Sequence, residues 1–171
     1  MKTGDLVKYG EKEGIILACS KNLYYVLFND DTSAYLREEE MERKVYVREL
    51  NMLDLEEVLK LDALSGNNLS QELDAEEYCW GIFVDNKLVG YCSLGGTDGT
   101  YSEIEDDISS FFLSDVFILE EYRKRGHGSF LINDVTAGKK VYLMPSDLEV
   151  EKFYEKNGFE HFGNSDLMYK E

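Results

Sequence analysis

The sequence has few of the residues on which metal sites and disulfide frameworks depend. Its three cysteines, Cys19, Cys79 and Cys92, are widely spaced and form no CxxC pair, so they indicate neither a disulfide framework nor a zinc site. Its two histidines, His127 and His161, lie far apart, with no carboxylate pattern around them. A metal cofactor is therefore not expected.

Long apolar runs are also missing. No stretch approaches the ~18 consecutive apolar residues that a membrane span needs, and the opening MKTGDLVKYGEKEG contains no apolar core of a signal peptide. Cysteine usage without a disulfide pattern fits reduced thiols. These features predict a cytoplasmic protein with no membrane partner.

Positive charge is scarce as well. The chain has 18 Lys and Arg against 35 Asp and Glu, a net charge of −17. Because binding to nucleic acid rests on clustered cations, no nucleic-acid partner is expected. The acidic excess is concentrated at residues 45–118, which hold 3 basic and 16 acidic side chains. Such a tract is either a solvated surface or a field that attracts a cationic substrate.

The chain does contain enough apolar material for a core. Of its 171 residues, 43% are hydrophobic and 13% aromatic, which predicts a globular domain with room for a small appendage. With a single proline and no Ser/Gly-rich linker, the boundary is taken where the sequence pattern changes. This change divides the chain into residues 1–43 and residues 44–171.

Short β-type runs dominate residues 1–43. They occur at residues 6–9, 14–18, 23–28 and 33–36, with a polar turn at 29–31. This layout resembles small five-stranded barrels of the Tudor or KOW type. Such barrels often bind peptides or nucleic acid, and the alternative is a patch that covers the surface of the remaining chain or builds a dimer.

Residues 44–171 alternate predicted strands and helices. A strand at 44–50 precedes a helix at 55–64 that Asp54 can cap, then a short helix at 72–77 and a hairpin, 80–84 with 88–94. An acidic loop at 95–110, a central strand at 111–119 and a helix at 129–137 follow. Strand 141–144, helix 148–156 and strand 167–170 complete a mixed α/β sheet with helices on its faces.

The motif that most clearly indicates a binding site is a basic turn between the central strand and the next helix. It reads Arg123-Lys124-Arg125-Gly126-His127-Gly128. The glycines let backbone N–H groups point outward at a helix N-terminus, where anions bind, and the cations add charge for a pyrophosphate. A dinucleotide fold would need glycine where Leu131 stands, and a P-loop would need Gly-Lys-Ser/Thr. A plain strand-to-helix turn with a solvated basic tip is the remaining alternative.

Two motifs in this order resemble the GNAT superfamily of acetyl-CoA-dependent N-acetyltransferases. They are Arg123-x-x-Gly126-x-Gly128 after a strand and, after one further strand, the run FYEKNGF at 153–159. The resemblance covers roughly residues 44–171, and residues 113–123 are most similar to the polyamine acetyltransferase branch. It implies an α/β (α+β) fold with a mixed, mostly antiparallel sheet flanked by helices, here preceded by the small barrel.

The resemblance also implies site residues. Tyr154 would protonate the departing CoA thiolate, for which a phenol that keeps its proton at neutral pH is suited; the alternative is an aromatic packed in the core, as is expected of Phe153. The cofactor acetyl-CoA would be held by a strand segment, which pairs with the pantetheine arm, and by the basic turn, which takes the pyrophosphate. These residues are Val116, Phe117, Ile118, Arg123, Lys124, Arg125, Gly126, His127, Gly128 and Ser129.

The chain departs from the family pattern at two positions. Asp147 stands where many relatives have an asparagine that contacts CoA, and Ser114 stands where polyamine enzymes have a glutamate proposed as base. The base would then be Asp115, a carboxylate of the loop at 103–107, or a water. Asp115, Glu103 and Glu105 are the residues expected to bind the substrate.

The expected function is acetyl transfer from acetyl-CoA to a primary amine. The acidic tract favours a small cationic acceptor that resembles a polyamine or an aminoglycoside. Alternatives are acetylation of a protein lysine or N-terminus, and a non-catalytic module that binds acyl-CoA. Because members of this superfamily often dimerise, a homodimer is a further expectation from the resemblance.

Overall fold

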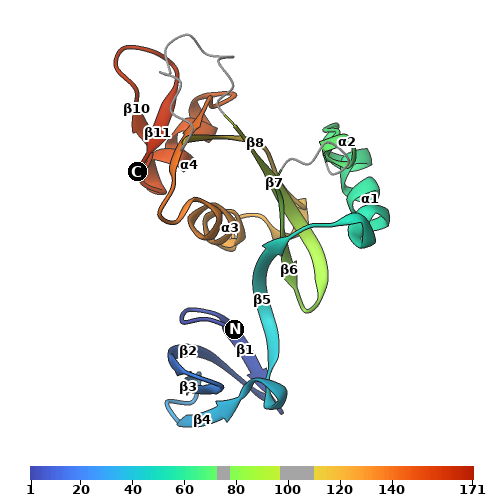
Figure 1. Ribbon diagram of the computed structural model, residues 1–171, viewed down its shortest axis with the longest axis vertical. Coiled ribbons are helices and arrows are strands. Elements are labelled where there is room, and N and C mark those ends of the chain that lie inside the picture. Colours follow the sequence, from blue (N-terminus) through green and yellow to red (C-terminus); the bar gives the residue numbers. More distant parts are fainter. Residues whose placement is uncertain (73–77, 97–109) are drawn as a thin grey trace. The chain divides into compact units, whose positions relative to one another are not determined.

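In a computed structural model, residues 1–72, 78–96 and 110–171 are described, and their strands belong to one sheet (Figure 1). The strand order is β10-β11-β9-β8-β7-β6-β5-β1-β2-β3-β4. The described chain forms two compact units, one of residues 1–46 with 82–88 and one of residues 47–81 with 89–171. The predicted division at residue 43 stays a prediction.

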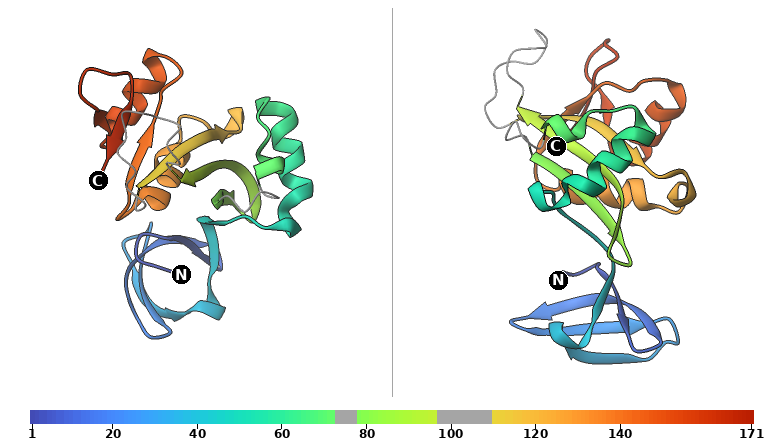
Figure 2. Two further views of the ribbon diagram at one scale, coloured as in Figure 1. Left: turned by 45° about the horizontal axis from the view of Figure 1, so that its top comes forward. Right: turned by 90° about the vertical axis from the view of Figure 1, so that its right-hand side faces the viewer.

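The first unit is built from β1 (Leu6–Tyr9), β2 (Lys12–Ser20), β3 (Leu23–Phe28), β4 (Ser33–Arg37) and the start of β5 (Glu42–Glu49). Successive strands β1 to β4 pair in antiparallel fashion and form the curled sheet at the N-terminus in Figure 2. Alternation along the strands turns one face inward. The buried cluster consists of Val7, Ile16, Tyr24, Val26, Phe28, Leu36 and Met41.

The expectation of a separate barrel is corrected by the pairing of β1. This strand pairs with β5 as well as with β2, so that Leu6 lies opposite Val45. The strands at the N-terminus therefore continue the sheet of the remaining chain, and β4 ends the strand order. The physical reason is that the four-residue strand β1 pairs with β2 on one side and with β5 on the other. It therefore links the N-terminal strands to the strands that follow β5 in the sheet.

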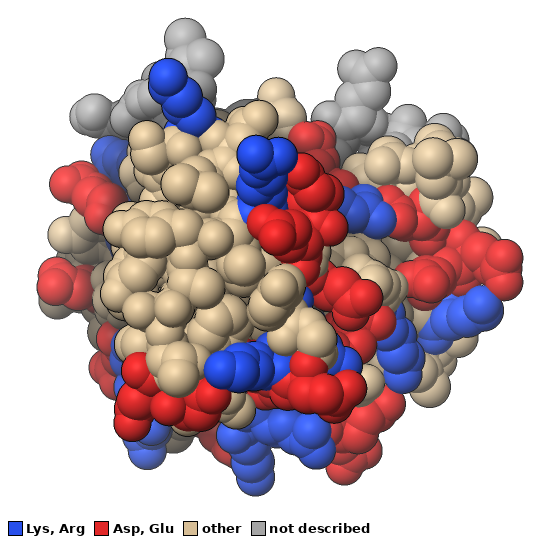
Figure 3. All heavy atoms as spheres, turned by 90° about the horizontal axis from the view of Figure 1, so that it is seen from below, with Lys and Arg blue, Asp and Glu red and all other residues tan. Residues whose placement is uncertain are grey.

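The tip of the hairpin formed by β6 (Tyr78–Val84) and β7 (Lys87–Gly96) belongs to the first unit. The rings of Tyr46 and Phe83 stack at 5.0 Å, and the Asp85 N–H donates to the Lys44 carbonyl at 2.9 Å. Basic side chains lie among acidic ones on the face in Figure 3.

In the second unit, β8 (Ser110–Ile118) pairs with β7 in antiparallel and with β9 (Lys140–Leu143) in parallel fashion. β9 then pairs in antiparallel fashion with β11 (Met168–Lys170), and β11 with β10 (Glu160–His161). The fold is thus α+β with a mixed, mostly antiparallel sheet, as the GNAT resemblance implies. The two-residue strand β10 is an addition to the predicted elements.

The helices of this unit lie on both faces of β7 and β8, with α1 and α2 on one face and α3 on the other (Figures 1 and 2). Their bounds are α1 Leu55–Ser65, α2 Leu69–Glu72, α3 His127–Thr136 and α4 Leu148–Lys156. Helix α4 has its predicted bounds, whereas most of the predicted helix at 72–77 lies outside the described residues. None of the described helices combines the length and apolar character that crossing a membrane requires.

Asp54 does not cap α1 as expected. Its carboxylate accepts two hydrogen bonds from the Arg48 guanidinium, at 2.6 and 2.8 Å, and one from the Asn51 N–H at 3.0 Å. These bonds to the charged form hold the pKa of Asp54 below its usual value, with Arg48 as the main cause. The side chain therefore ties β5 to the turn before α1 and is not available to the helix.

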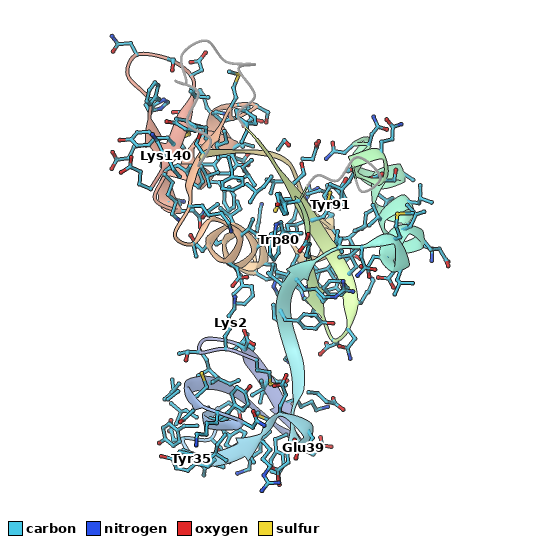
Figure 4. All side chains as sticks on the ribbon, viewed as in Figure 1. Lys2, Tyr35, Glu39, Trp80, Tyr91 and Lys140 are labelled. Atoms are coloured by element: carbon cyan, nitrogen blue, oxygen red, sulfur yellow. The ribbon has the colours of Figure 1, made fainter. Side chains whose placement is uncertain are left out.

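A buried carboxylate joins α1, α2 and β7. Asp62 accepts hydrogen bonds from the Leu69 and Ser70 N–H groups, at 3.2 and 2.9 Å, and from the Tyr91 hydroxyl at 3.0 Å. Figure 4 shows Tyr91 pointing from β7 toward α1, where it also bonds Ser65 at 2.7 Å. The Asp62 carboxylate is thus satisfied in the core and fixes the ring of Tyr91.

Candidate active site

Strand β8 carries a bulge in its middle. Its register with β7 changes from Tyr91 opposite Phe117 to Ser93 opposite Ser114, so that two residues of β8 oppose the single residue between them on β7. Asp115, one of the two, has a φ of +49°, a left-handed conformation that aspartate tolerates better than most residues. The bulge bends the strand and increases its twist at this point.

Beyond its third residue, β8 has no partner on the β9 side. The parallel pairing ends with Phe112 opposite Tyr142, and the described residues contain no further pair between the two strands. The Leu119 N–H donates to the Val89 carbonyl on β7 at 2.9 Å. Because the backbone groups of successive residues in a strand point to opposite edges, the N–H of Ile118 faces away from β7.

The basic turn is held at the end of this free edge. The Arg123 Nε donates to the Ile118 carbonyl at 2.8 Å, and its guanidinium lies 5.6 Å from the centre of the Phe117 ring. Arg125 lies over the Tyr122 ring at 6.0 Å. Within the described residues, neither Lys124 nor Arg125 forms an ion pair, so their charges are available to an anion.

Helix α3 begins at His127, two residues earlier than predicted, because Gly126 takes a left-handed conformation with φ +86°. The first hydrogen bond of the helix runs from the Phe130 N–H to the Gly126 carbonyl at 2.9 Å. The N–H groups of the first residues of a helix have no partner inside it. Three such groups, those of residues 127–129, therefore point out of the turn beside the cations, where an anion is stabilised.

The surroundings of His127 favour its neutral form. Burial lowers its pKa, and the neighbouring Arg125 lowers it further. Its ring lies 6.0 Å from that of Tyr122. The anion-attracting charge of the turn consequently comes from Arg123, Lys124 and Arg125.

Asp147 caps helix α4 at the edge of the same site. Its carboxylate accepts hydrogen bonds from the Glu149 and Val150 N–H groups, at 2.8 and 3.0 Å, and these bonds lower its pKa. The aspartate in the place of the family's asparagine therefore has a structural explanation. Its negative charge is bound by the helix N-terminus.

The first two aromatic residues of the second motif, Phe153 and Tyr154, exchange their expected places. Phe153, expected in the core, is half-buried and faces the turn, where a Cβ on Gly128 would lie 3.3 Å from its ring. Tyr154 is the more buried of the two, at 7% exposure, and packs on Phe159 with ring centres 5.5 Å apart. Burial raises the pKa of Tyr154, and the Cys92 thiol raises it further.

These elements enclose a cavity of about 670 Å³ between β8, the basic turn and α4. It brings together eight of the ten predicted cofactor-binding residues. Arg125 and His127, also of that set, do not line it, nor do Tyr154 and Asp115, while Glu103 and Glu105 lie outside the described residues. The lining residues are Val116, Phe117, Ile118, Arg123, Lys124, Gly126, Gly128, Ser129, Asp147, Glu149, Val150 and Phe153.

Glu149 and Val150 had no part in the predicted site. They were missed because the prediction used the FYEKNGF run and not the start of α4. Asp147 is a favourable N-cap residue, so the start of α4 could be predicted, but its position at the cavity depends on the packing of the helix in the fold.

A family model described as acetyltransferase (GNAT) domain matches residues 75–161. The chain belongs to the GNAT family. As a member of this family, the protein is an acetyltransferase that depends on acetyl-CoA. No protein in the search of curated proteins matches its sequence.

Solved structures of GNAT acetyltransferases share its fold. The N-acetyltransferase YhbS from Escherichia coli, in complex with CoA, is 14% identical with a TM-score of 0.58, over 74% of this chain and 80% of that one. PaiA N-acetyltransferase from Thermoplasma acidophilum, in complex with coenzyme A, is 19% identical with a TM-score of 0.55, over 74% and 98%. Aminoglycoside 6'-acetyltransferase type Ii is 20% identical with a TM-score of 0.54, over 73% and 96%.

Ser114 forms a hydrogen bond between two strands of the sheet. Its hydroxyl bonds that of Ser93 across the strands at 2.7 Å, and Ser93 is fully buried. The serine pair links β7 and β8 next to the bulge at Asp115. Ser114 is thus a structural neighbour of the bend, and no carboxylate occupies its position.

Proposed function

We propose that this acetyltransferase transfers the acetyl group of acetyl-CoA to a primary amine of a small cationic molecule that resembles a polyamine or an aminoglycoside. The observation that carries the proposal is the continuity of the free β8 edge with the cationic turn in one cavity. An edge of unpaired amides suits an amide-containing arm, and a turn with cations and free N–H groups suits a pyrophosphate.

The cofactor would follow these two surfaces in order. Val116 and Ile118 present backbone groups on the free edge, with which the pantetheine arm would pair as a neighbouring strand does. Phe117 between them lies opposite Tyr91 on β7 and lines the same cavity. The N–H groups of residues 124–129 would hold the pyrophosphate, with the Arg123, Lys124 and Arg125 side chains nearby. The fit is supported by the start of α3 at His127, which leaves its first amides directed out of the turn.

The reaction forms a bond between the amine nitrogen and the acetyl carbon and breaks the bond from that carbon to sulfur. The amine must lose a proton, and the departing thiolate gains one. The Ile118 N–H, which faces away from β7, would stabilise charge on the carbonyl oxygen. Tyr154 would supply the proton to the thiolate, because its raised pKa keeps the phenol protonated at neutral pH.

The base that receives the amine proton is proposed to be Asp115, directly or through a water. Its place on the bulge of β8, next to the cavity-lining Val116, supports this role. Glu103 and Glu105 would join Asp115 in binding the acceptor. The remainder of the catalysis is the positioning of two substrates against each other.

The acceptor class is inferred from charge. Residues 45–118 have 13 more acidic than basic side chains, and such a field attracts protonated amines. The likeness in fold to aminoglycoside 6'-acetyltransferase type Ii supports the same class, since an aminoglycoside is a polycationic amine.

A panel of amines tests the proposal. The purified chain is incubated with acetyl-CoA and with spermidine, an aminoglycoside, a neutral monoamine or an acidic amino acid, and thiol release is followed. We expect release with the cationic amines, at a rate that falls as salt screens the charges, and none with the acidic amine. No release with any small amine, together with transfer of label from acetyl-CoA to lysate proteins, would overturn the small-molecule acceptor. Tight CoA binding without any transfer would overturn the enzymatic role.

A further inference from the structure

An aromatic pair connects the buried core of the second unit to the cavity. Tyr91 on β7 lies opposite Phe117 on β8, so the two side chains stand on the same face of the sheet. Their ring centres are 5.7 Å apart and their planes are inclined by 38°. Tyr91 is fully buried, whereas Phe117 is half-buried and lines the cavity. A change at Tyr91 can therefore reach the cavity only through Phe117 and its neighbours.

On the cavity side, the ring of Phe117 supports the guanidinium of Arg123. The guanidinium carbon lies 5.6 Å from the ring centre, which is within the range of a cation–π contact. The Arg123 Nε donates to the Ile118 carbonyl at 2.8 Å. This bond uses one of the five N–H groups of the guanidinium, and no ion pair among the described residues engages the others. The remaining N–H groups can therefore donate to an anion in the cavity that Arg123 lines.

At its other end, the row is anchored to the first helix of the unit. The Tyr91 hydroxyl donates to the Asp62 carboxylate at 3.0 Å and bonds the Ser65 hydroxyl at 2.7 Å. Asp62 is buried and also accepts hydrogen bonds from two backbone N–H groups at the start of α2. Movement of the Tyr91 ring would break these bonds inside the core, where an unpaired polar group is costly. The position of the ring is therefore fixed.

Phe117 has no comparable anchor. Its phenyl ring carries no polar group, so packing alone sets the ring's orientation. Aromatic pairs at this separation contribute more than their buried area and favour particular ring geometries. The Tyr91 ring thus limits the orientations of the Phe117 ring, and the Phe117 ring presents one face to the guanidinium.

We propose that Tyr91 is a positioning residue for acetyl-CoA, which sets, through the ring of Phe117, the plane in which Arg123 meets the pyrophosphate. The inference rests on the proposed function, in which the Arg123 side chain lies beside that group. Tyr91 touches neither the cofactor nor the acceptor. It couples the hydrogen bonds of Asp62 in the core to the affinity of the basic turn for CoA.

The variant Tyr91→Phe removes the hydroxyl and keeps the ring. Calorimetry with CoA on the full chain should show a Kd that is higher by about 2–10-fold, the factor to which the energy of one aromatic pair corresponds. Ser65→Ala removes a partner of the same hydroxyl from a half-buried position and should raise Kd in the same direction. This second variant keeps the test valid if Tyr91→Phe does not fold.

A matched control separates positioning from stability. Tyr24 is another buried tyrosine, and its hydroxyl donates to the Glu38 carboxylate at 2.9 Å in the first unit. Tyr24→Phe therefore makes the same chemical change away from the row. It should lower the melting temperature and leave the Kd for CoA at the parent value. A purely structural role of Tyr91 would give the same result in Tyr91→Phe.

A double-mutant cycle tests whether Tyr91 acts through Arg123. Arg123→Ala alone should weaken CoA binding by about 10-fold or more, because it removes charged hydrogen bonds. In that background, Tyr91→Phe should cause no further change in Kd, since the row no longer ends on a guanidinium. An unchanged Kd in both Tyr91→Phe and Ser65→Ala, or an equal effect of Tyr91→Phe in both backgrounds, would overturn the inference and leave the proposed function standing. An unchanged Kd in Arg123→Ala would overturn the placement of the pyrophosphate, and the inference with it.

Discussion

Replacing Gly90 with alanine tests whether the close approach of β7 and β8 sets the geometry of the acetyl-transfer site. Gly90 lies opposite Ile118 on the neighbouring strand. A Cβ built on it would lie 2.5 Å from the Phe117 carbonyl oxygen and 2.5 Å from the Ile118 Cδ1. The side chain of Ile118 can rotate away, but the carbonyl belongs to the backbone and must move.

The size of that movement follows from ordinary contact distances. Restoring a contact of about 3.4 Å requires β8 to move by about 0.9 Å at Phe117. The bond from the Leu119 N–H to Val89, now 2.9 Å, would lengthen beyond hydrogen-bond range if it took up the whole shift. We expect a loss of about 1–3 kcal/mol in the free energy of unfolding. A displacement near 1 Å beside the reacting groups costs about 100-fold in rate.

Gly96, on the same strand, provides the matched control. A Cβ on Gly96 would have no atom within 4 Å, so Gly96→Ala should leave both the thiol-release rate and the melting temperature near the parent values. Both variants are measured by circular dichroism and by initial rates with saturating acetyl-CoA. Parent-like rate and melting temperature in Gly90→Ala would refute the reasoning that this contact positions β8.

Three further substitutions separate the remaining roles. Tyr154→Phe should lower kcat by about 10²–10⁴-fold without changing the KM for acetyl-CoA. The control Tyr142→Phe, at another buried tyrosine, should leave kcat near the parent value. A kcat of Tyr154→Phe equal to that of the parent would contradict the acid role. Lys124→Ala should raise the KM for acetyl-CoA and flatten its dependence on salt, measured by initial rates; an unchanged KM would contradict a phosphate contact. Asp54→Asn should destabilise the chain by about 1–2 kcal/mol at pH 7, since it breaks the pair with Arg48. Because folding lowers the pKa of Asp54, this difference should shrink below about pH 4 in denaturation measurements, and a constant difference would contradict it.

Elements with local determinants could be predicted from the sequence. Helix α4 begins after Asp147 and ends before Gly158, and both residues act through their own backbone neighbourhood. The basic turn is equally local, because Gly126 supplies the left-handed conformation that starts α3. The start of α3 was nevertheless two residues late in the prediction, since a histidine and a glycine are weak helix formers.

Features that depend on pairing between distant strands could not be predicted. Whether the strands at the N-terminus close on themselves depends on the contact of β1 with β5, some 40 residues later. The bulge at Asp115 depends on the register with β7, which no residue of β8 fixes by itself. The meeting of His161 with Glu151 likewise requires the return of the chain after α4. In each case, the deciding partner lies outside the local window in which periodicity is visible.

The divided pairing of β8 explains how one strand can serve both the core and the site. Near its start, Phe111 and Phe112 pair with β7 on one side and with β9 on the other, and hold the sheet together. An unpaired edge in the remainder of the strand would ordinarily invite association with another chain. Here the edge lines a cavity between the basic turn and α4, and Phe153 is among the residues that line it. In the function proposed above, the pantetheine arm would pair with this edge, so the amides that would be a liability on an open edge would be covered by a narrow ligand with amide groups of its own.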